Sequence, residues 1–298
     1  MTKTFFVFIF CGMLLLQGCG GVNQQDQQAD ATDMVVRITE APAKGSLFII
    51  GGGSRPEEMI SRMVDEAGLH TGGLVVILPM ASEESDSAII WSGEQFFNQG
   101  LTEVVGFNFR PGEMPSAARL DSLQNASLIY ISGGSQSRFM DIVRDSPIYD
   151  AIHAAYSNGA MIAGTSAGAA VMSQKMITGD QLRHPEYRPT YPVIESNNID
   201  LEEGLGLLTT AIIDQHFVWR SRHNRLITAI LEYPELPGIG IDESTAILVR
   251  GNTAEVIGIS QVLVFRNPSS IRSAWNEKIG GTGLVLDVYL PGDTFMIQ

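Results

Sequence analysis

The chain has 298 residues, of which 44% are apolar, and its 33 acidic residues against 19 lysines and arginines give a formal net charge of −14 at pH 7. This acidic balance argues against nucleic acid as a partner, because binding to phosphates needs clustered cationic side chains. With only two cysteines, the fold depends on a conventional hydrophobic core, and the length suffices for one α/β domain behind an N-terminal segment.

The N-terminus is typical of a bacterial lipoprotein. Lys3 supplies a positive charge, and the apolar run from Phe5 to Leu16 is too short to span a bilayer as a helix. Residues 16–19 (LQGC) resemble the lipobox, in which cleavage before the cysteine leaves it acylated. We therefore expect a signal peptide at residues 1–18, a lipid anchor with palmitate on Cys19, and a location in the cell envelope, at the outer membrane or the cell surface. The alternative is an ordinary signal peptide with a chance cysteine.

Cleavage at this point changes little else in the chain. It removes Lys3 and no acidic residue, so the formal charge goes from −14 to −15. Cys11 is lost with the signal peptide, so the mature chain has no pair of cysteines for a disulfide. Residues 19–44 are rich in Gln, Asp and Ala and predict a flexible tether. Residues 45–298 are expected to form a single domain.

Beyond residue 45, apolar runs of strand length alternate with segments of helical period. The expected strands are 47–50, 74–78, 104–107 and 128–131, and the expected helices are 56–68, 84–99, 116–124 and 149–158. Near-continuous apolar strands separated by helices indicate a parallel sheet covered on both faces. Ligands bind such sheets at the carboxyl ends of the strands, where the glycine turns at 51–53 and 133–134 and the segment around Ser166 all fall.

The later part of the chain follows another pattern. Residues 173–203 show no clear period and predict a long loop, which inside a compact domain is usually functional. After Glu243 the chain contains shorter β-like runs, which we interpret as an antiparallel extension of the sheet.

The pentapeptide at 164–168 (GTSAG) has the G-x-S-x-G pattern of a nucleophile elbow. It follows an apolar strand-like run and precedes a helix-like one, which is the context that the motif requires. The glycines permit a sharp turn that exposes the hydroxyl of Ser166, and the N–H groups of Gly134 and Ala167 are candidates for stabilising an oxyanion. A glycine-rich turn that merely packs tightly would show the same pattern.

A serine nucleophile needs a base, and the base needs an orienting acid. Among five histidines, His216 alone directly follows an apolar strand-like run, 212–215. The run 239–241 ends in Asp242 and Glu243, whose side chains point to opposite sides of a strand, so only one can face His216. No histidine follows His223, and the order serine, histidine, acid differs from that of α/β-hydrolases.

Three segments together resemble a known family. They are 164–173 (GTSAGAAVMS), 212–226 (IIDQHFVWRSRHNRL) and 238–249 (GIGIDESTAILV), and they are similar to cyanophycinase and its relative dipeptidase E. The resemblance implies an α/β three-layer parallel-sheet sandwich of the class I glutamine amidotransferase type, and a serine peptidase. We expect no cofactor and no metal, because the candidate metal ligands are scattered and no His/Cys cluster has ligand spacing. It assigns the nucleophile to Ser166, the base to His216 and the acid to Glu243, with Asp180 as second choice.

The resemblance also implies a substrate. Cyanophycinases hydrolyse cyanophycin, a polyaspartate with an arginine on each β-carboxyl group, to β-Asp-Arg dipeptides. The family's substrate-binding positions correspond to Gln136, Asp214, Gln215, Arg220, Arg222 and Arg225, with Arg222 expected to dominate. Ser135 departs from the usual Asp of the preceding turn, whereas Gln136 favours cyanophycinase over dipeptidase E.

Other functions stay open at this point. One is an aspartyl dipeptidase that acts on short peptides, and another is a non-catalytic surface binding protein with the same fold. Arg222 and Arg225 could also form surface pairs on a helix. The family further implies a possible homodimer.

Overall fold

The computed structural model describes residues 45–186, 188 and 190–298, which fall in one compact unit. The predicted signal peptide (1–18), Cys19 and the predicted tether (19–44) lie outside the described residues. In the part of the chain that is described, no helix is both long enough and apolar enough to cross a membrane.

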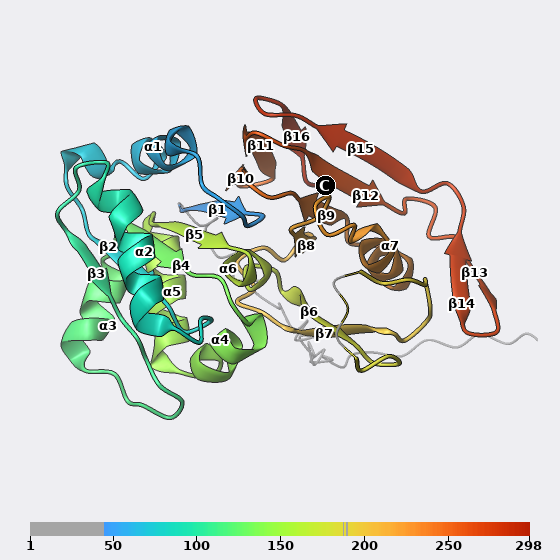
Figure 1. Cartoon of the computed structure of the whole chain (residues 1–298), viewed down its shortest axis with the longest axis horizontal. Coiled ribbons are helices and arrows are strands. Elements are labelled where there is room, and N and C mark those ends of the chain that lie inside the picture. The colour runs from blue at the N-terminus through green and yellow to red at the C-terminus, as the bar shows by residue number, and fades with distance from the viewer. Residues whose placement is uncertain (1–44, 187, 189) are drawn as a thin grey trace, which may run out of the picture. The chain divides into compact units, whose positions relative to one another are not determined.

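A mixed sheet of eight strands forms the centre of the fold (Figure 1). Five strands are mutually parallel and run in the order β1-β5-β4-β2-β3, and three antiparallel strands, β10, β11 and β16, continue the sheet beyond β1. Their bounds are Ser46–Ile50 (β1), Val75–Leu78 (β2), Val104–Gly106 (β3), Leu128–Ile131 (β4), Met161–Thr165 (β5), Thr245–Arg250 (β10), Thr253–Gly258 (β11) and Thr294–Met296 (β16). The predicted α/β fold with a parallel sheet is confirmed, and so are the four strands predicted before residue 132.

Helices cover both faces of this sheet. They are α1 (Glu57–Glu66), α2 (Ser85–Phe97), α3 (Ala117–Gln124), α4 (Gln136–Val143), α5 (Pro147–Asn158) and the single turn α6 (Ala167–Ala170), with a short 3-10 turn at Leu69–Thr71. Alternate residues of β1 serve the two faces: Phe48 and Ile50 share a core with α1, while Leu47 and Ile49 belong to the core of the other face. This alternation follows from the two-residue period of a strand.

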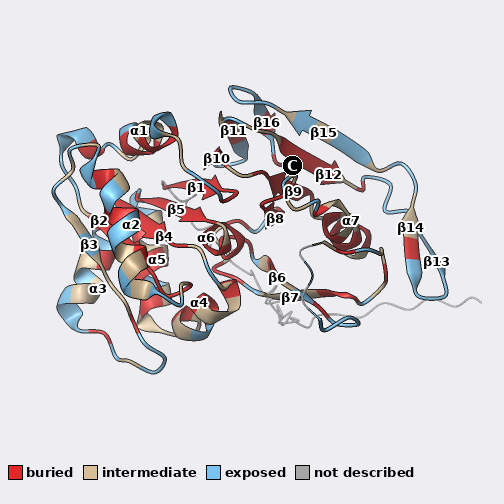
Figure 2. Cartoon of the chain, viewed as in Figure 1, coloured by how far each residue is buried: buried red, intermediate tan, exposed pale blue. Residues whose placement is uncertain are grey.

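A second sheet packs beside the first, with strand order β15-β12-β9-β8. Its strands are β8 (Ile212–Gln215), β9 (Gly238–Ile241), β12 (Val262–Arg266) and β15 (Val285–Tyr289), and α7 (His223–Glu232) packs against it. Figure 2 shows β8, β9 and β12 buried and β15 largely exposed at the edge. The predicted antiparallel extension is therefore divided: β10 and β11 extend the first sheet, whereas β12 and β15 join the second.

The segment predicted as a long loop contains two paired strands, β6 (Lys175–Gln181) and β7 (Ile199–Glu203). We call residues 175–203 the arm. Ile177 and Ile199 are buried in the core around α7, Leu201 packs against it, and Met176 belongs to the core of the main sheet. The pairing register shifts between Ile177 and Gln181, which explains why no clean alternation is visible in the sequence. A hairpin of β13 (Arg272–Trp275) and β14 (Lys278–Gly281) bonds to the arm, because the Ile279 N–H donates to the Ile194 carbonyl.

Candidate active site

The end of β1 and the glycine turn after it hold three segments of the chain together. The Ile50 carbonyl accepts a hydrogen bond from the Ser166 N–H at 3.0 Å, and the Gly51 carbonyl accepts one from the His216 N–H at 2.7 Å. The Gly52 carbonyl accepts a third from the Ser244 N–H at 2.8 Å. One short stretch of backbone therefore fixes the predicted nucleophile, the predicted base and the neighbour of the predicted acid.

Glycine is required in this turn by close packing. A Cβ atom on Gly52 would lie 2.3 Å from Cε1 of His216, and one on Gly53 would lie 2.8 Å from Cβ of Glu243. Both glycines also have positive φ angles, +114° and +70°, which side chains rarely permit. The imidazole of His216 and the side chain of Glu243 therefore pack directly against the backbone of this turn.

Three of the eight described non-glycine residues with positive φ angles lie at the same place. Ser166 (φ 54°, ψ −109°) forms the sharp turn between β5 and α6, and His216 and Ser244 also have positive φ angles, 49° and 54°. Because such conformations cost free energy in residues other than glycine, they persist where the surrounding structure enforces them, and they cluster at functional sites. The predicted elbow has the expected strand–turn–helix form, although its helix is only one turn long.

The side chains form a continuous line of hydrogen bonds. Ser166 Oγ lies 2.8 Å from Nε2 of His216, and Nδ1 of His216 lies 2.5 Å from Oε1 of Glu243. These distances fit an imidazole that donates from Nδ1 to the carboxylate and accepts the serine proton at Nε2. A hydroxyl held in this way can be deprotonated as it attacks a carbonyl carbon.

The structure separates the three acidic candidates. Asp242 faces the other side of β9, where its carboxylate accepts hydrogen bonds from the Trp219 N–H and the Ser260 hydroxyl. Asp180 lies on β6, exposed, with its backbone carbonyl bonded to the Tyr191 hydroxyl. Glu243 is the carboxylate in contact with His216.

Ser166 opens into a hollow of about 250 Å³, which we call the Ser166 hollow. Its lining includes most of the predicted site residues: Gly134, Gln136, Ser166, Asp180, Gln215, Arg220, Arg222 and Arg225. The Gly133–Gly134 turn lies directly against the serine, since a Cβ on Gly133 would be 3.4 Å from Cβ of Ser166. Larger hollows lie elsewhere on the surface, but none of them includes Ser166.

The three arginines of the hollow differ in their contacts. The buried Arg225 grips the buried Asp214 with two hydrogen bonds, one of them from Nε to Oδ2 at 2.6 Å. Arg222, also buried, donates to the backbone carbonyl and to the side-chain oxygen of Gln215 at 2.8 and 2.7 Å. Arg220 is half-buried and forms no ion pair with any described residue. Nη1 of Arg222 also lies 3.7 Å from Oδ1 of Asp214. Of the three arginines, Arg220 is therefore the one that has no ion pair with a described carboxylate.

Gln136 connects the hollow to the arm. Its amide nitrogen donates to the Ile177 carbonyl at 2.8 Å and to the Thr178 carbonyl, while its helix α4 begins at the Ser135 cap. Gln136 therefore fixes the arm residues Thr178, Gly179 and Asp180, which line the hollow beside it.

The pKa of His216 is lowered from its ordinary value near 6.5. Burial of the imidazole is the largest cause, because a dry environment disfavours the charged form. The hydrogen bond to Glu243 raises the pKa, and the positive charges of Arg220 and Arg222 lower it again. A neutral imidazole, which is the form that can accept a proton, is favoured near pH 7.

The other histidines have structural contacts. His70 pairs with Asp65, His153 bonds to the Leu205 carbonyl, and His184 pairs with Glu195. No cluster of three or more His, Cys, Asp or Glu side chains that could hold a metal ion occurs among the described residues.

Sequence reasoning missed the roles of Gly52, Gly53 and the Thr178–Gly179 pair. The triple glycine at 51–53 was a visible signal for close backbone approach, but it did not reveal which side chains would rest on it. The arm residues carried no signal, because their position depends on the amide of Gln136.

An α/β fold with a serine on a strand-to-helix elbow, facing an imidazole, defines a serine-type hydrolase. The model of peptidase family S51 matches residues 47–257, and the chain belongs to this family of serine-type peptidases.

Relatives in sequence agree with this family, and a solved structure agrees with the fold. The chain is 32% identical over 282 residues to a cyanophycinase of Nostoc sp., covering 90% of both chains, and 29% identical over 269 residues to one of Synechococcus elongatus, covering 86% of this chain and 80% of the relative. The fold resembles the crystal structure of a peptidase from an acI-B1 Actinobacterium, with a TM-score of 0.57, 21% identity, and 83% of this chain and 98% of the other covered.

The charge of Arg220 should be measurable in the titration of His216. Because a nearby cation disfavours the imidazolium, replacing Arg220 with Gln removes that repulsion, and the pKa of His216 should rise from its lowered value. NMR titration of the imidazole resonances measures it directly, with the exposed Arg110→Gln as a control of equal charge change. A pKa unchanged in Arg220→Gln would contradict the electrostatic explanation.

The pair of Asp214 and Arg225 should contribute strongly to stability. Replacing Asp214 with Asn leaves a buried guanidinium without its carboxylate, which costs about 3–5 kcal/mol. The free energy of unfolding in urea measures this loss. Asp287→Asn, which breaks the more exposed pair with Arg266, should cost about 1 kcal/mol or less. Equal losses in the two variants would refute a special role for the buried pair.

Proposed function

We propose that this chain is a cyanophycin-hydrolysing peptidase that uses Ser166, His216 and Glu243 as its catalytic triad. The observation that carries the proposal is the line of hydrogen bonds from Ser166 Oγ through His216 to Glu243. The strained φ angles of Ser166 and His216, both held by the glycine turn, support it.

The reaction proceeds in two steps. Ser166 Oγ attacks the carbonyl carbon of an aspartyl peptide bond, and its proton moves to Nε2 of His216. The negative oxygen that forms is stabilised by the N–H groups of Gly134 and Ala167. His216 then gives the proton to the leaving nitrogen, the C–N bond breaks, and an acyl-serine remains. Water, deprotonated by His216, cleaves this ester and restores the serine.

The charges around the hollow support a substrate with free carboxylates. Each arginine of cyanophycin carries an α-carboxylate, and a guanidinium can bind a carboxylate through two parallel hydrogen bonds. Arg222 and Arg225 are engaged by Gln215 and Asp214, so we assign the first contact with this carboxylate to Arg220 rather than to Arg222. Arg222, Arg225, Asp214 and Gln215 then hold the walls of the hollow, and Gln136 holds the arm.

A second candidate is an aspartyl peptidase that acts on short peptides. A peptidase E of Nostoc sp. is 22% identical over 190 residues, covering 60% of this chain and 73% of that protein. The higher identity and coverage of the cyanophycinases, together with Gln136, favour the polymer.

For the location, we propose a lipid anchor on Cys19 and a place in the bacterial cell envelope, outer membrane or cell surface. A polymer too large for import suits an enzyme outside the cytoplasm. A homodimer stays an expectation from the family resemblance.

The triad can be tested by three substitutions assayed on purified cyanophycin. Ser166→Ala should lower kcat by about a million-fold, as in comparable triads, with little change in thermal stability. Glu243→Gln should lower it far more than Asp180→Asn, because an amide favours the wrong tautomer of His216. Turnover close to normal in Ser166→Ala, or the reverse ranking of the two acid variants, would sink the assignment. Wild-type protein that cleaves α-aspartyl dipeptides but not cyanophycin would establish the second candidate instead.

The anchor can be tested by metabolic labelling. In a bacterial host, the wild-type chain should incorporate a palmitate analogue and partition into detergent, whereas Cys19→Ser should do neither. Unchanged labelling of Cys19→Ser would rule out acylation at this cysteine, and Cys11→Ser serves as the matched control that should still be labelled.

A further inference from the structure

A second hollow, of about 550 Å³, lies on the outer part of the arm, and we call it the arm hollow. In a chain with a net charge of −14, it gathers four basic side chains: Arg183, His184, Arg188 and Lys278. Two carboxylates, Glu186 and Glu195, also line it. The arm hollow therefore offers both signs of charge within one site.

We infer that the arm hollow is a subsite for a further unit of a polymeric substrate, whose side group carries both a carboxylate and a guanidinium. The inference rests on the proposed cyanophycin substrate. It assigns a specificity role to residues outside the Ser166 hollow.

The walls of this subsite are fixed by ion pairs. The side chain of Glu195, 6% exposed, bonds to Nζ of Lys278 at 2.5 Å and to Nε2 of His184 at 2.7 Å. Arg183 pairs with Glu277 at 2.5 Å, and the Ser196 N–H donates to the Glu277 carbonyl at 2.9 Å. The arm is therefore held by contacts with the hairpin β13–β14 and the turn within it.

Two charges in the arm hollow are open to a ligand. Arg188 and Glu186 are exposed, and neither forms an ion pair with a described residue. Arg188 can bind a carboxylate and Glu186 a guanidinium, while the apolar Pro185, Pro192 and Val193 can contact the methylene stem between them.

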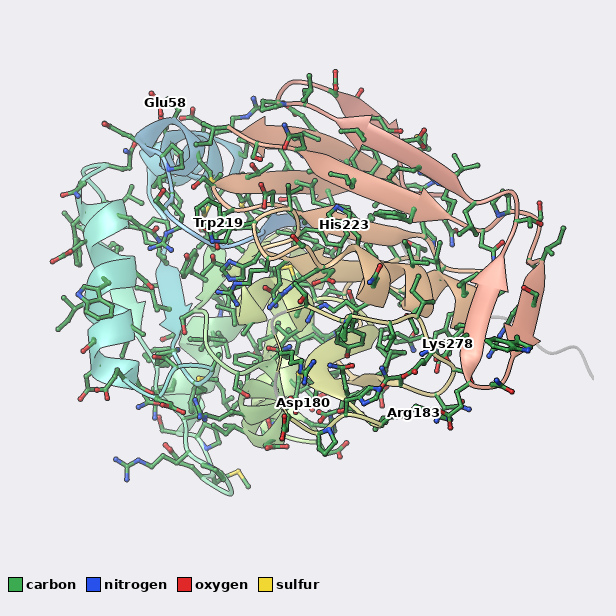
Figure 3. The ribbon with its side chains drawn as sticks, turned by 45° about the vertical axis from the view of Figure 1, so that its right-hand side comes forward. Glu58, Asp180, Arg183, Trp219, His223 and Lys278 are labelled. Carbon is green, nitrogen blue, oxygen red and sulfur yellow. The ribbon has the colours of Figure 1, made fainter. Side chains whose placement is uncertain are left out.

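The two hollows are neighbours along the arm. Asp180 lines the Ser166 hollow, and the next residue of β6, Gln181, points to the opposite side of the strand and lines the arm hollow. Arg183 lies within about 11 Å of chain from Asp180, so a polymer that passes over the edge of the arm can reach both hollows. Figure 3 labels Asp180 and Arg183 low in that view and Lys278 higher at the right. A single dipeptide in the Ser166 hollow cannot fill both sites, whereas a polymer with an arginyl group on every residue can.

The test measures how binding depends on chain length. In the inactive Ser166→Ala background, calorimetry gives the Kd of a two-unit β-Asp-Arg oligomer and of a longer one. The longer oligomer should bind more tightly, and Arg188→Glu should reduce this preference about three- to tenfold, as expected for a charged contact near the surface. Arg188→Lys should retain part of it. Arg110→Glu, the same charge change on an exposed arginine of the loop before α3, should leave the preference intact.

The outcomes separate this inference from the proposed function. Absence of any length preference in the Ser166→Ala background, a preference unchanged in Arg188→Glu, or an equal loss in Arg110→Glu would overturn the subsite. If the wild-type chain hydrolyses both oligomers at equal kcat/KM and binds them equally, the subsite fails and the proposed function stands. If binding depends on length and on Arg188 but the wild-type chain hydrolyses neither oligomer, the proposed function fails and the subsite stands.

Discussion

Three consecutive carbonyl groups at the end of β1 hold the site together. Each accepts a hydrogen bond from a different segment: the elbow at Ser166, the end of β8 at His216, and the turn after Glu243. Because the acceptors are neighbours in the chain, the three donors cannot move apart independently. The glycines let those segments approach until the imidazole and the carboxylate rest directly on backbone. The positions of Ser166, His216 and Glu243 are therefore set by the backbone, and the side chains need only extend from it.

Around this centre, charge is arranged in two zones. The pair of Asp214 and Arg225 is buried, and its Arg225, in the first turn of α7, also lines the hollow. Arg220 lies closer to the opening, where it lowers the pKa of His216 and is available to an anion. Burial is the main reason that the imidazole stays neutral, and the positive charge of Arg220, which adds to this effect, would also attract a substrate carboxylate.

The strands before residue 132 could be predicted because their apolar runs are bounded by helices and by turn residues. Ser166 and His216 could be recognised because each directly follows a predicted strand. The residue pattern alone left Asp242 and Glu243 open, and it was the family resemblance that favoured Glu243, the carboxylate that contacts His216 in the structure. The strands of the arm were missed because their backbone pairing contains a register shift and polar residues at 178–180. The bond between Asp214 and Arg225 was also hidden, since it joins a strand to a helix across a loop that has no sequence period.

The pairing of the first described strand with β10 has a consequence for folding. Leu47 pairs with Val249 and Ile50 with Ala246, so the pairing of β1 with β10 cannot form until most of the chain is available. Contacts between residues this distant in sequence form slowly, because a large loop must close before they stabilise the structure. The hydrogen bond from the Ser244 N–H to the Gly52 carbonyl, next to Glu243, depends on the same closure. A chain that lacks the β1–β10 pairing therefore lacks the contact that holds Glu243 beside His216, and the complete site would assemble only with this long-range step of folding.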